Sequence, residues 1–593
     1  MSVETERYVG PGEPSWTRPT RLSGAVYAAK VVAFRARRAL VNATSGPPRL
    51  SRAGLEGLDE VAAESRTPLW SDEARAERAF QLGKIHNLRV ACRALDGVVI
   101  PAGAVFSFWR QVGPPFASRG FVRGRMLQEG CMVAAVGGGL CQLSNALYEA
   151  ALQAGCRIVE RHPHSRIVPG SAAARGRDAT VAWNYVDLRF APDRALRISA
   201  RLDRDSLAIR FLGAAGDTAP RRPDTRRAFA PGAAAPFLPR SCGTCEETDC
   251  HLHEPGRGKT ARPARVQAFL VDEAWPELRA YVQATRQSQD RLGRPLDGGR
   301  LGVGRYDWNA QGFDRAASAP LAALGRSLAL RGAGRSGAAA RRAELASAER
   351  VAGALARLLT FDVDAVTVAQ SYLPFLWRDG RLGGREVSVL MTRLPMAEIQ
   401  VRLDAAAASR PECATLADFR APSWLVQAET EALAASARII TPHAAVAALF
   451  GERAVKTAWE IPPGRPRAAG EPRGRIAFPG PTAARKGAYA VRDAAIALDL
   501  EVAPLGSELE GADFWRGVRL APHGDWTAVD AVVQPAIVEH QPRRLLAALA
   551  AGAPVIATEA CGLDPRPGLM LIPPDDSDAL IAALRDILAQ RTL

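Results

Sequence analysis

The sequence predicts a multidomain protein, in which an α+β domain is followed by an α/β region built from two halves. The chain has 593 residues, which is too long for one hydrophobic core and suits about three domains. Up to about residue 212, a helical pattern gives way to alternating strands. From about residue 262, short apolar runs alternate with helices rich in Ala and Leu. That alternation is typical of parallel sheets.

Residues 1–60 form a polar and basic lead. Within it, residues 19–41 predict a short basic helix, which packs either on its own domain or on a membrane surface. The sequence contains no run of about 18 apolar residues, so no transmembrane helix is expected. The polar start does not resemble a secretory signal. We therefore expect a cytoplasmic protein, with peripheral membrane contact as the alternative.

The charge and the cysteine content exclude two classes of protein. The chain has 77 basic and 62 acidic residues, mostly Arg among the former, for a net charge of +15. This excess could aid binding of phosphate or anionic lipid. No basic stripe interleaved with aromatic residues occurs, so nucleic acid is not an expected partner. Nine unevenly spaced cysteines without a secretory signal argue against a disulfide scaffold.

Residues 61–212 form the first predicted domain. Three glycines lead into a helix that runs from Cys141 to about Gln153. From Val181 the apolar period changes to two, which predicts strand structure, and residues 197–211 predict a β-hairpin. The pattern indicates an α+β domain that ends in antiparallel strands.

Cys141 is the sharpest chemical feature of this domain. It stands at the start of a helix, where the dipole favours a thiolate. His162 and His164 flank a proline in an extended segment, so both can approach one site. Cys141 is then a nucleophile with a histidine base oriented by Asp178, a metal ligand together with the histidines, or a small packed residue at a tight turn. The glycines before it could also form an anion-binding nest.

Five sequence blocks follow one another between residues 101 and 181. They are Pro101–Phe108, Val112–Pro114, Gly137–Tyr148, Ile158–Ser165 and Gly176–Val181. Together these blocks resemble the VanW family over residues 85–212 or so. The resemblance implies a link to glycopeptide-antibiotic resistance, and it supplies no reaction.

A linker and a dense set of soft metal ligands follow this domain. Residues 213–240 are rich in Ala, Pro, Gly and Arg and show no periodicity. In residues 241–254 the candidate ligands are Cys242, Cys245, Cys250, His251 and His253. A zinc site with three cysteines and one histidine fits them, and so does an iron–sulfur cluster that takes its fourth ligand from elsewhere. A cysteine redox pair is a further alternative, and the spacing does not choose between zinc and iron–sulfur.

Buried-strand runs recur through the rest of the chain. They are residues 265–271, 365–369, 437–441, 476–479, 531–534 and 554–558. About 330 residues of this alternation suit two Rossmann-like halves. We expect these halves at residues 262–430 and 431–593.

Arg485 and Lys486 lie where the strand ending at Phe478 leads into a helix that begins near Ala488. Two basic side chains at such a junction can hold a diphosphate, assisted by the helix N-terminus. This junction and residues 533–558 resemble the C-terminal half of retaining GT-B glycosyltransferases. The resemblance implies a nucleotide-sugar between the halves, with Arg485 and Lys486 on its diphosphate and Glu539 on the sugar nucleotide.

The sequence departs from this family at one position. The family pattern places a second glutamate eight residues after the first, where this chain has Ala547 after Glu539. The missing carboxylate usually holds the ribose. A non-catalytic, degenerate GT-B scaffold is therefore an open alternative.

These features predict a VanW-like α+β domain fused to a GT-B-like α/β pair. We expect a role in cell-envelope glycan or peptidoglycan metabolism or in glycopeptide resistance, with sugar transfer from a nucleotide-sugar to a glycan or peptidoglycan-precursor acceptor. The alternatives are a non-catalytic binding or accessory protein, and an iron–sulfur or redox-linked enzyme that uses Cys242, Cys245 and Cys250. The donor, the acceptor and the oligomeric state do not follow from the sequence.

Overall fold

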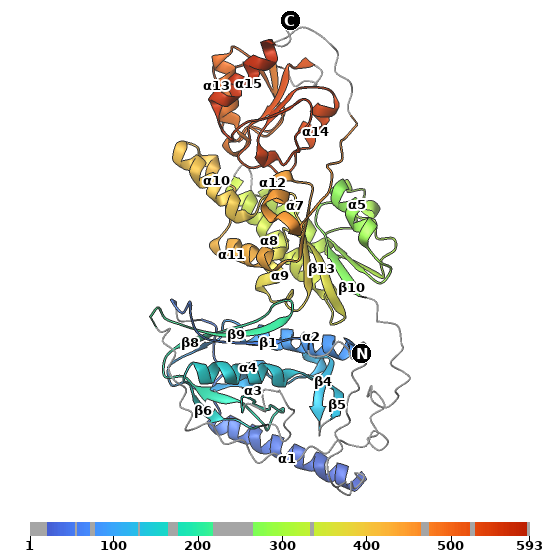
Figure 1. Cartoon of the computed structure of the whole chain (residues 1–593), viewed down its shortest axis with the longest axis vertical. Coiled ribbons are helices and arrows are strands. Elements are labelled where there is room, and N and C mark those ends of the chain that lie inside the picture. The colour runs from blue at the N-terminus through green and yellow to red at the C-terminus, as the bar shows by residue number, and fades with distance from the viewer. Residues whose placement is uncertain are drawn as a thin grey trace, which may run out of the picture. The chain divides into compact units, whose positions relative to one another are not determined.

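The chain forms two compact units, Met1–Ala264 (unit 1) and Arg265–Leu593 (unit 2). The computed structural model (Figure 1) describes residues 21–53, 56–70, 78–128, 131–163, 176–216, 265–332, 337–463, 474–521 and 528–589. The division between the units falls close to residue 262, where the sequence pattern changes. Each unit has its own hydrophobic core.

Unit 1 is centred on an antiparallel sheet in the order β1-β9-β8-β2. Its strands are β1 (Glu60–Pro68), β2 (Val99–Ile100), β8 (Leu196–Leu202) and β9 (Ser206–Gly213). Every second residue of β8 is buried, because alternate side chains of a strand face the core. The helices α2 (Arg78–Leu95) and α4 (Leu140–Gln153) pack on this sheet (Figure 1). The predicted hairpin and the predicted helix after the glycines are both confirmed.

Smaller elements complete unit 1. They are α1 (Arg21–Ser45), β3 (Phe106–Ser107), α3 (Phe108–Val112), the short helix η2 (Ala117–Arg119), β4 (Arg123–Gln128), β5 (Cys131–Val136), β6 (Arg157–Glu160) and β7 (Arg189–Ala191). The strand expected from Val181 is wrong: residues 182–186 form a turn closed by a bridge between Ala182 and Val186. Its Trp183 packs edge-on against Trp109 at 5.4 Å, so the aromatic residues here serve the packing of a turn.

The first sheet of unit 2 is entirely parallel, in the order β12-β11-β10-β13-β14-β15-β16. Its strands are β10 (Val266–Leu270), β11 (Arg291–Arg294), β12 (Arg315–Ser318), β13 (Val363–Ala369), β14 (Glu386–Leu390), β15 (Arg438–Thr441) and β16 (Ala454–Lys456). All seven residues of β13 are buried, since helices cover both faces of such a sheet.

Helices connect these strands (Figure 1). They are α5 (Pro276–Thr285), α6 (Gly298–Leu301), α7 (Pro320–Gly332), α8 (Gly337–Leu355), α9 (Leu373–Arg378), α10 (Met396–Ser409), α11 (Ser423–Ala435) and α12 (Ala444–Phe450), with short η7 (Gly304–Tyr306), η8 (Ala356–Leu358), η9 (Ala414–Ala417) and η10 (Gly451–Arg453). His443 caps α12 by accepting a hydrogen bond from the Val446 N–H at 3.3 Å, and it is fully buried. This histidine is therefore structural.

The second sheet of unit 2 is also parallel, in the order β19-β18-β17-β20-β21-β22. Its strands are β17 (Arg475–Phe478), β18 (Glu501–Pro504), β19 (Arg519–Leu520), β20 (Ala531–Gln534), β21 (Val555–Ala557) and β22 (Leu569–Leu571). Its helices are η11 (Ala484–Lys486), α13 (Ala488–Ala497), α14 (Arg543–Ala550), η13 (Glu559–Cys561) and α15 (Ser577–Ala589).

The two halves of unit 2 divide later than the sequence suggested. Strand β15, expected in the second half, pairs with β14 of the first sheet and places Ile439 opposite Val389. The first sheet therefore continues to Lys456, and the division follows that residue instead of falling at 430. All six predicted strand runs are confirmed, as β10, β13, β15, β17, β20 and β21.

The strand order reverses once in each sheet, next to β10 in the first and next to β17 in the second. At such a reversal the connecting helices diverge to opposite faces, and a crevice opens at the carboxyl ends of the strands. Both sheets of unit 2 therefore have a natural ligand position. Among the helices in the described part of the chain, none is long and apolar enough to cross a membrane.

Candidate functional site

Unit 2 contains a cavity of about 1200 Å³ at the carboxyl ends of its two sheets. From the first sheet, the wall takes residues that follow β10, β13 and β14, such as Asp272, Ser371 and Arg393. From the second sheet, it takes residues that follow β17, β18 and β20, such as Arg485 and His540. Both strand-order reversals thus open onto one cavity.

Arg485, Lys486 and Glu539 come together at one junction of this cavity. Lys486 Nζ lies 2.9 Å from Glu539 Oε2 and also donates to the Val538 carbonyl at 3.1 Å. The carbonyl of Arg485 accepts from the backbone N–H groups of Ile537 and Val538, which joins η11 to the segment after β20. The side chain of Arg485 reaches the cavity wall, whereas the Lys486–Glu539 pair is buried.

The carboxylate of Glu539 is held by four donors. Besides Lys486, it accepts from the Gln534 amide and from the backbone N–H groups of His540 and Gln541, both at 2.8 Å. Burial alone would raise the pKa of Glu539, but the charge of Lys486, the neighbouring His540 and these hydrogen bonds lower it to about 2. Burial, and next the charge of Lys486, lowers the pKa of His540 to about 4. At neutral pH Glu539 is therefore ionised beside a neutral His540.

Asp272 is a cavity residue that the sequence reasoning missed. It follows β10 at the reversal point of the first sheet and accepts from Ser371 Oγ at 2.8 Å and from Tyr372 Oη at 3.3 Å. Burial, and next the charge of Glu273, raises the pKa of Asp272. A signal was present in the sequence, since the acidic pair Asp272 and Glu273 follows one predicted buried strand and Ser371 follows another.

The glycines before Cys141 are required for packing between β5 and α4. Gly137 and Gly139 have φ values of +79° and +99°, and a Cβ at Gly138 would lie 2.2 Å from the Gly124 carbonyl oxygen. The N–H of Gly137 donates to Val122, and that of Gly138 donates to Ala135. Two of the three N–H groups of the expected anion nest therefore already have carbonyl partners.

Cys141, His162 and Asp178 have three different partners. Cys141 Sγ lies 3.9 Å from the Val181 carbonyl oxygen, and His162 Nε2 lies 3.2 Å from Glu160 Oε1. Asp178 Oδ1 accepts from Arg161 Nη2 at 2.6 Å, and both side chains are buried. His164 lies outside the described residues. The described contacts do not join Cys141 to a base and an acid, so its role as a nucleophile stays a prediction.

Two family models match separate parts of the chain. Residues 83–212 match the model described as VanW like protein, and residues 507–590 match the model described as Glycosyl transferases group 1. The second match lies in the half that carries Glu539, within a unit of two parallel sheets that open onto one cavity. The chain thus combines a VanW-like domain with a glycosyltransferase-like domain, which is unit 2 and is called the GT-B domain below.

Curated relatives are similar to the VanW-like domain. The uncharacterized protein YoaR of Bacillus subtilis is 38% identical over 105 residues, which is 18% of this chain and 34% of YoaR. The vancomycin B-type resistance protein VanW of Enterococcus faecalis is 30% identical over 145 residues, which is 24% of this chain and 52% of VanW. The chain thus spans from about a third to about half of the length of these relatives.

Solved glycosyltransferase structures are similar to 55% of the chain. Sucrose-phosphate synthase from Thermosynechococcus elongatus has a TM-score of 0.35 and 15% identity, with 90% of its chain covered. HepE of Anabaena, solved with UDP and glucose, has a TM-score of 0.32 and 14% identity, with 91% of its chain covered.

The family's second glutamate is absent from the GT-B domain. Its position is taken by Ala547 in α14, which offers no carboxylate. On the same helix, Arg543 Nη1 instead pairs with Glu277 Oε1 of the first half at 2.7 Å. The helix therefore tethers the two halves at this point.

No metal site appears among the residues that the structure describes. Within them, no group of three or more His, Cys, Asp or Glu side chains could hold an ion. The candidate ligands Cys242, Cys245, Cys250, His251 and His253 all lie outside the described residues. The zinc site and the iron–sulfur cluster thus stay predictions.

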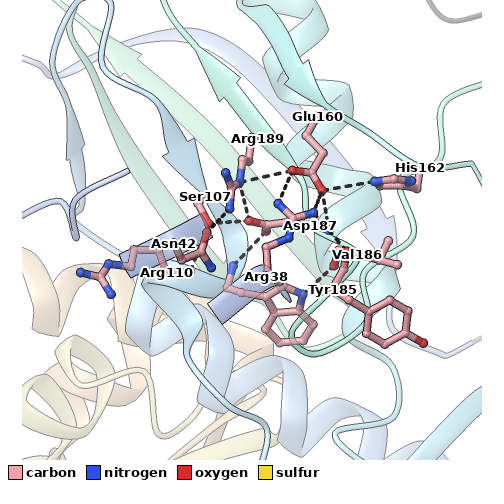
Figure 2. A network of polar contacts seen from close by, with 11 residues as sticks. Arg38, Asn42, Ser107, Arg110, Glu160, His162, Tyr185, Val186, Asp187 and Arg189 are labelled. Atoms are coloured by element: carbon pink, nitrogen blue, oxygen red, sulfur yellow. Dashed lines mark hydrogen bonds and ion pairs between the residues drawn. The ribbon is translucent and has the colours of Figure 1, made fainter. Parts of the chain in front are cut away.

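A partly buried polar network in the VanW-like domain escaped the sequence reasoning. Arg38 of α1 donates to both carboxylate oxygens of Glu160, at 2.8 and 2.6 Å. Figure 2 shows Arg189 between Glu160 and Asp187, with its Nε 3.4 Å from Glu160 Oε2 and 2.8 Å from Asp187 Oδ2. Arg189 also donates to Asn42 of α1 at 2.7 Å. The polar side of α1 is therefore tied to β6 and β7 through charges distant in sequence.

The network predicts that the VanW-like domain loses stability in acid, and that Glu160 is responsible for part of this loss. Partial burial raises the pKa of Glu160, but the contacts with His162 and Arg38 lower it to about 2, against an ordinary value of 4.5. Because the folded-state pKa is the lower one, this carboxylate stabilises the fold above about pH 5, and its contribution is lost as the pH falls toward 2. Glu160→Gln should lower the melting temperature near pH 7 and cost less near pH 3.

Differential scanning calorimetry of the full chain at both pH values measures this effect. The exposed Glu56→Gln is the matched control and should leave both temperatures unchanged. An equal loss at both pH values in Glu160→Gln would contradict the assignment.

Proposed function

We propose that the GT-B domain transfers a glycosyl group from a nucleotide-sugar donor to a cell-envelope glycan or peptidoglycan-precursor acceptor. The observation that carries this proposal is the environment of the Arg485 side chain. Within the described residues its guanidinium forms no ion pair or hydrogen bond, although it is largely buried on the cavity wall and lies near the Phe419 ring. A cation without a partner beside a strand-order reversal suits the diphosphate of a nucleotide.

The neighbouring groups have separate tasks in this proposal. Lys486 and the ionised Glu539 hold each other and the backbone of His540 and Gln541 at the cavity wall, so they present a rigid surface to the sugar nucleotide. Asp272 lies on the wall supplied by the first half. Its carboxyl group, held by Ser371 and Tyr372, would accept a hydrogen bond from an acceptor hydroxyl.

In this proposal the VanW-like domain acts on the acceptor, or binds it before transfer, and links the chain to glycopeptide resistance. The support is its similarity to the vancomycin B-type resistance protein VanW. Cys141, with His162 or His164 and Asp178, remains the candidate reactive group there. The candidate metal site is the set of cysteines and histidines from Cys242 to His253.

Arg485→Ala tests the donor site. Hydrogen bonds to charged groups contribute about 1.5–3 kcal/mol, so we expect UDP binding to weaken by roughly tenfold or more. Isothermal titration of the full chain with UDP, GDP and ADP measures the effect. Arg516→Ala is a matched control, because Arg516 is 83% exposed in the same half of the domain.

Two results would count against the proposal. Failure of the wild-type protein to bind any of these nucleotides would reject a donor site. An unchanged affinity in Arg485→Ala would reject the role of that residue. Binding of a nucleotide-sugar without hydrolysis or transfer, across a panel of donors and acceptors, would instead favour the non-catalytic scaffold.

A further inference from the structure

Three arginine side chains gather on the cavity wall of the GT-B domain. Arg341 comes from α8, Arg393 from the segment after β14, and Arg485 from η11. The guanidinium carbon of Arg341 lies 4.3 Å from the ring centroid of Phe419, and that of Arg485 lies 5.9 Å from the same centroid. Burial, and next the charge of Arg393, lowers the pKa of Arg341 to about 10. Arg341 and Arg393 are thus close enough to repel each other, and Arg341 and Arg485 share the Phe419 ring.

The positive charge of Arg341 has few polar partners, although the side chain is only 12% exposed. Its Nη1 lies 3.4 Å from Glu344 Oε2, and Glu344 also lies 3.8 Å from Arg326. Its Nη2 faces the Met396 sulfur at 3.6 Å, and its Nε is buried without a hydrogen-bond partner in the described part of the chain. A buried donor without an oxygen partner destabilises the free protein. Arg341 lines the cavity, so a ligand oxygen paired with its Nη groups would lower the cost of burying this cation.

The carboxylates near these arginines are already shared. Arg393 Nη2 lies 3.1 Å from Glu429 Oε1, and Glu429 also accepts from the Gln370 amide and the Met396 N–H. Arg485 has no carboxylate partner among the described residues. Asp418 and other carboxylates act on Arg485 from beyond ion-pair distance, so none of them takes its hydrogen-bond donors. The planar fork of a guanidinium matches the oxygens of a phosphate or a carboxylate.

Two of these three side chains come from the half of the domain that does not carry the proposed donor-binding residue. Arg341 and Arg393 belong to the first half of the domain, whereas Arg485 belongs to the second half. The cavity of about 1200 Å³ also exceeds the roughly 300–1,000 Å³ of a typical small-molecule site. It has room for a second ligand beside a nucleotide.

We propose that Arg341 and Arg393 bind an oxyanion carried by the acceptor, so that the acceptor is a phosphorylated or carboxylated molecule and not a neutral sugar. This proposal rests on the proposed function, in which Arg485 binds the donor. It assigns Arg341 as the residue whose open donors select the acceptor. Arg393 supplies a second charge and keeps its contact with Glu429.

Calorimetric titration of the full chain with inorganic phosphate and with acetate, each with and without saturating UDP, tests the proposal. We expect phosphate or acetate to bind the UDP-saturated protein, and Arg341→Met to weaken that binding at least tenfold while UDP affinity stays within twofold of the wild type. Arg341→Lys keeps the charge and should retain part of the affinity. Tighter binding of phosphate indicates a phosphorylated acceptor, and tighter binding of acetate indicates a carboxylated one.

The stability of Arg341→Met separates a ligand-binding role from a structural one. Methionine keeps the apolar stem and removes an uncompensated cation, so the melting temperature should equal or exceed that of the wild type. A lower melting temperature would assign Arg341 to the fold and overturn the proposal. The exposed Arg516→Ala should change neither binding nor stability.

The binding data distinguish the two proposals. If UDP binds but neither anion binds the UDP-saturated protein, or if Arg341→Met binds both anions as the wild type does, the acceptor site is overturned and the donor site stands. If UDP does not bind at all, the proposed function fails, and the acceptor site fails with it.

Discussion

Lys486→Ala should lower the free energy of unfolding of the GT-B domain by about 3–5 kcal/mol near pH 7, because it leaves a charged partner buried. Lys486 and Glu539 are 8% and 6% exposed, and their charged atoms lie 2.9 Å apart. After the substitution, Glu539 keeps its contacts with Gln534 and the backbone N–H groups but loses its cation. Hydrogen exchange of peptides that cover β20 and α14 measures the loss within the full chain.

The pH dependence and a double variant identify the cause. In the wild type the pKa of Glu539 is about 2, below its ordinary 4.5, so its stabilising contribution is present above about pH 5 and is lost as the pH falls toward 2. In Lys486→Ala the burial of Glu539 is no longer offset by the charge of Lys486, so the pKa of Glu539 rises. The loss of unfolding free energy caused by the substitution should therefore shrink below about pH 4. Lys486→Met combined with Glu539→Leu removes both charges and should recover most of the stability. An equal cost in the single and double variants would contradict a buried ion pair.

Asp178→Ala should lower the free energy of unfolding of the VanW-like domain by a similar amount, about 3–5 kcal/mol. Arg161 and Asp178 are 1% and 3% exposed, and Arg161 Nη2 lies 2.6 Å from Asp178 Oδ1. The Arg161 guanidinium also lies 5.4 Å from the Tyr148 ring of α4. Removal of the carboxylate leaves this cation inside the core beside α4. Hydrogen exchange of peptides from Leu140–Gln153 reports the loss.

This measurement also tests Asp178 as a residue that orients a catalytic histidine. Arg161→Met combined with Asp178→Leu removes both charges and should be more stable than Asp178→Ala alone. Native stability in Asp178→Ala, together with reduced reactivity of Cys141 toward an alkylating reagent, would instead support the orienting role. The two outcomes exclude each other.

The elements were predictable where one local pattern dominates. The buried runs at β13 and β20 are continuously apolar because both faces of a parallel sheet are covered. Helix α4 starts where glycines end the preceding strand, as the sequence indicates. The same local reasoning failed at Trp183, because alternating aromatic residues occur both in strands and in packed turns. Only the contact between Trp183 and Trp109 distinguishes the two.

The candidate sites were predictable only as single residues. Arg485 and Lys486 followed from their position between a predicted strand and helix, and Glu539 from the resemblance to GT-B glycosyltransferases. Their division into a buried pair and a side chain on the cavity wall did not follow from the sequence. Asp178 was expected beside a histidine, and its described partner is Arg161. Glu160 and Arg38, 122 residues apart, carry no local signal of their pairing.

The sequence by itself determined that the chain joins a VanW-like domain to a glycosyltransferase-like one, and where the hairpin at 197–211, the helix after the glycines and six strands of unit 2 lie. These properties follow from periodicity, turn residues and ordered motifs, which neighbouring residues encode. The tertiary structure alone decided that β15 belongs to the first sheet, that Lys486 neutralises Glu539, and that Arg341 and Arg485 meet at Phe419. Charge pairing and burial depend on which distant segments pack together, because a buried charge takes its partner from whatever the fold brings near.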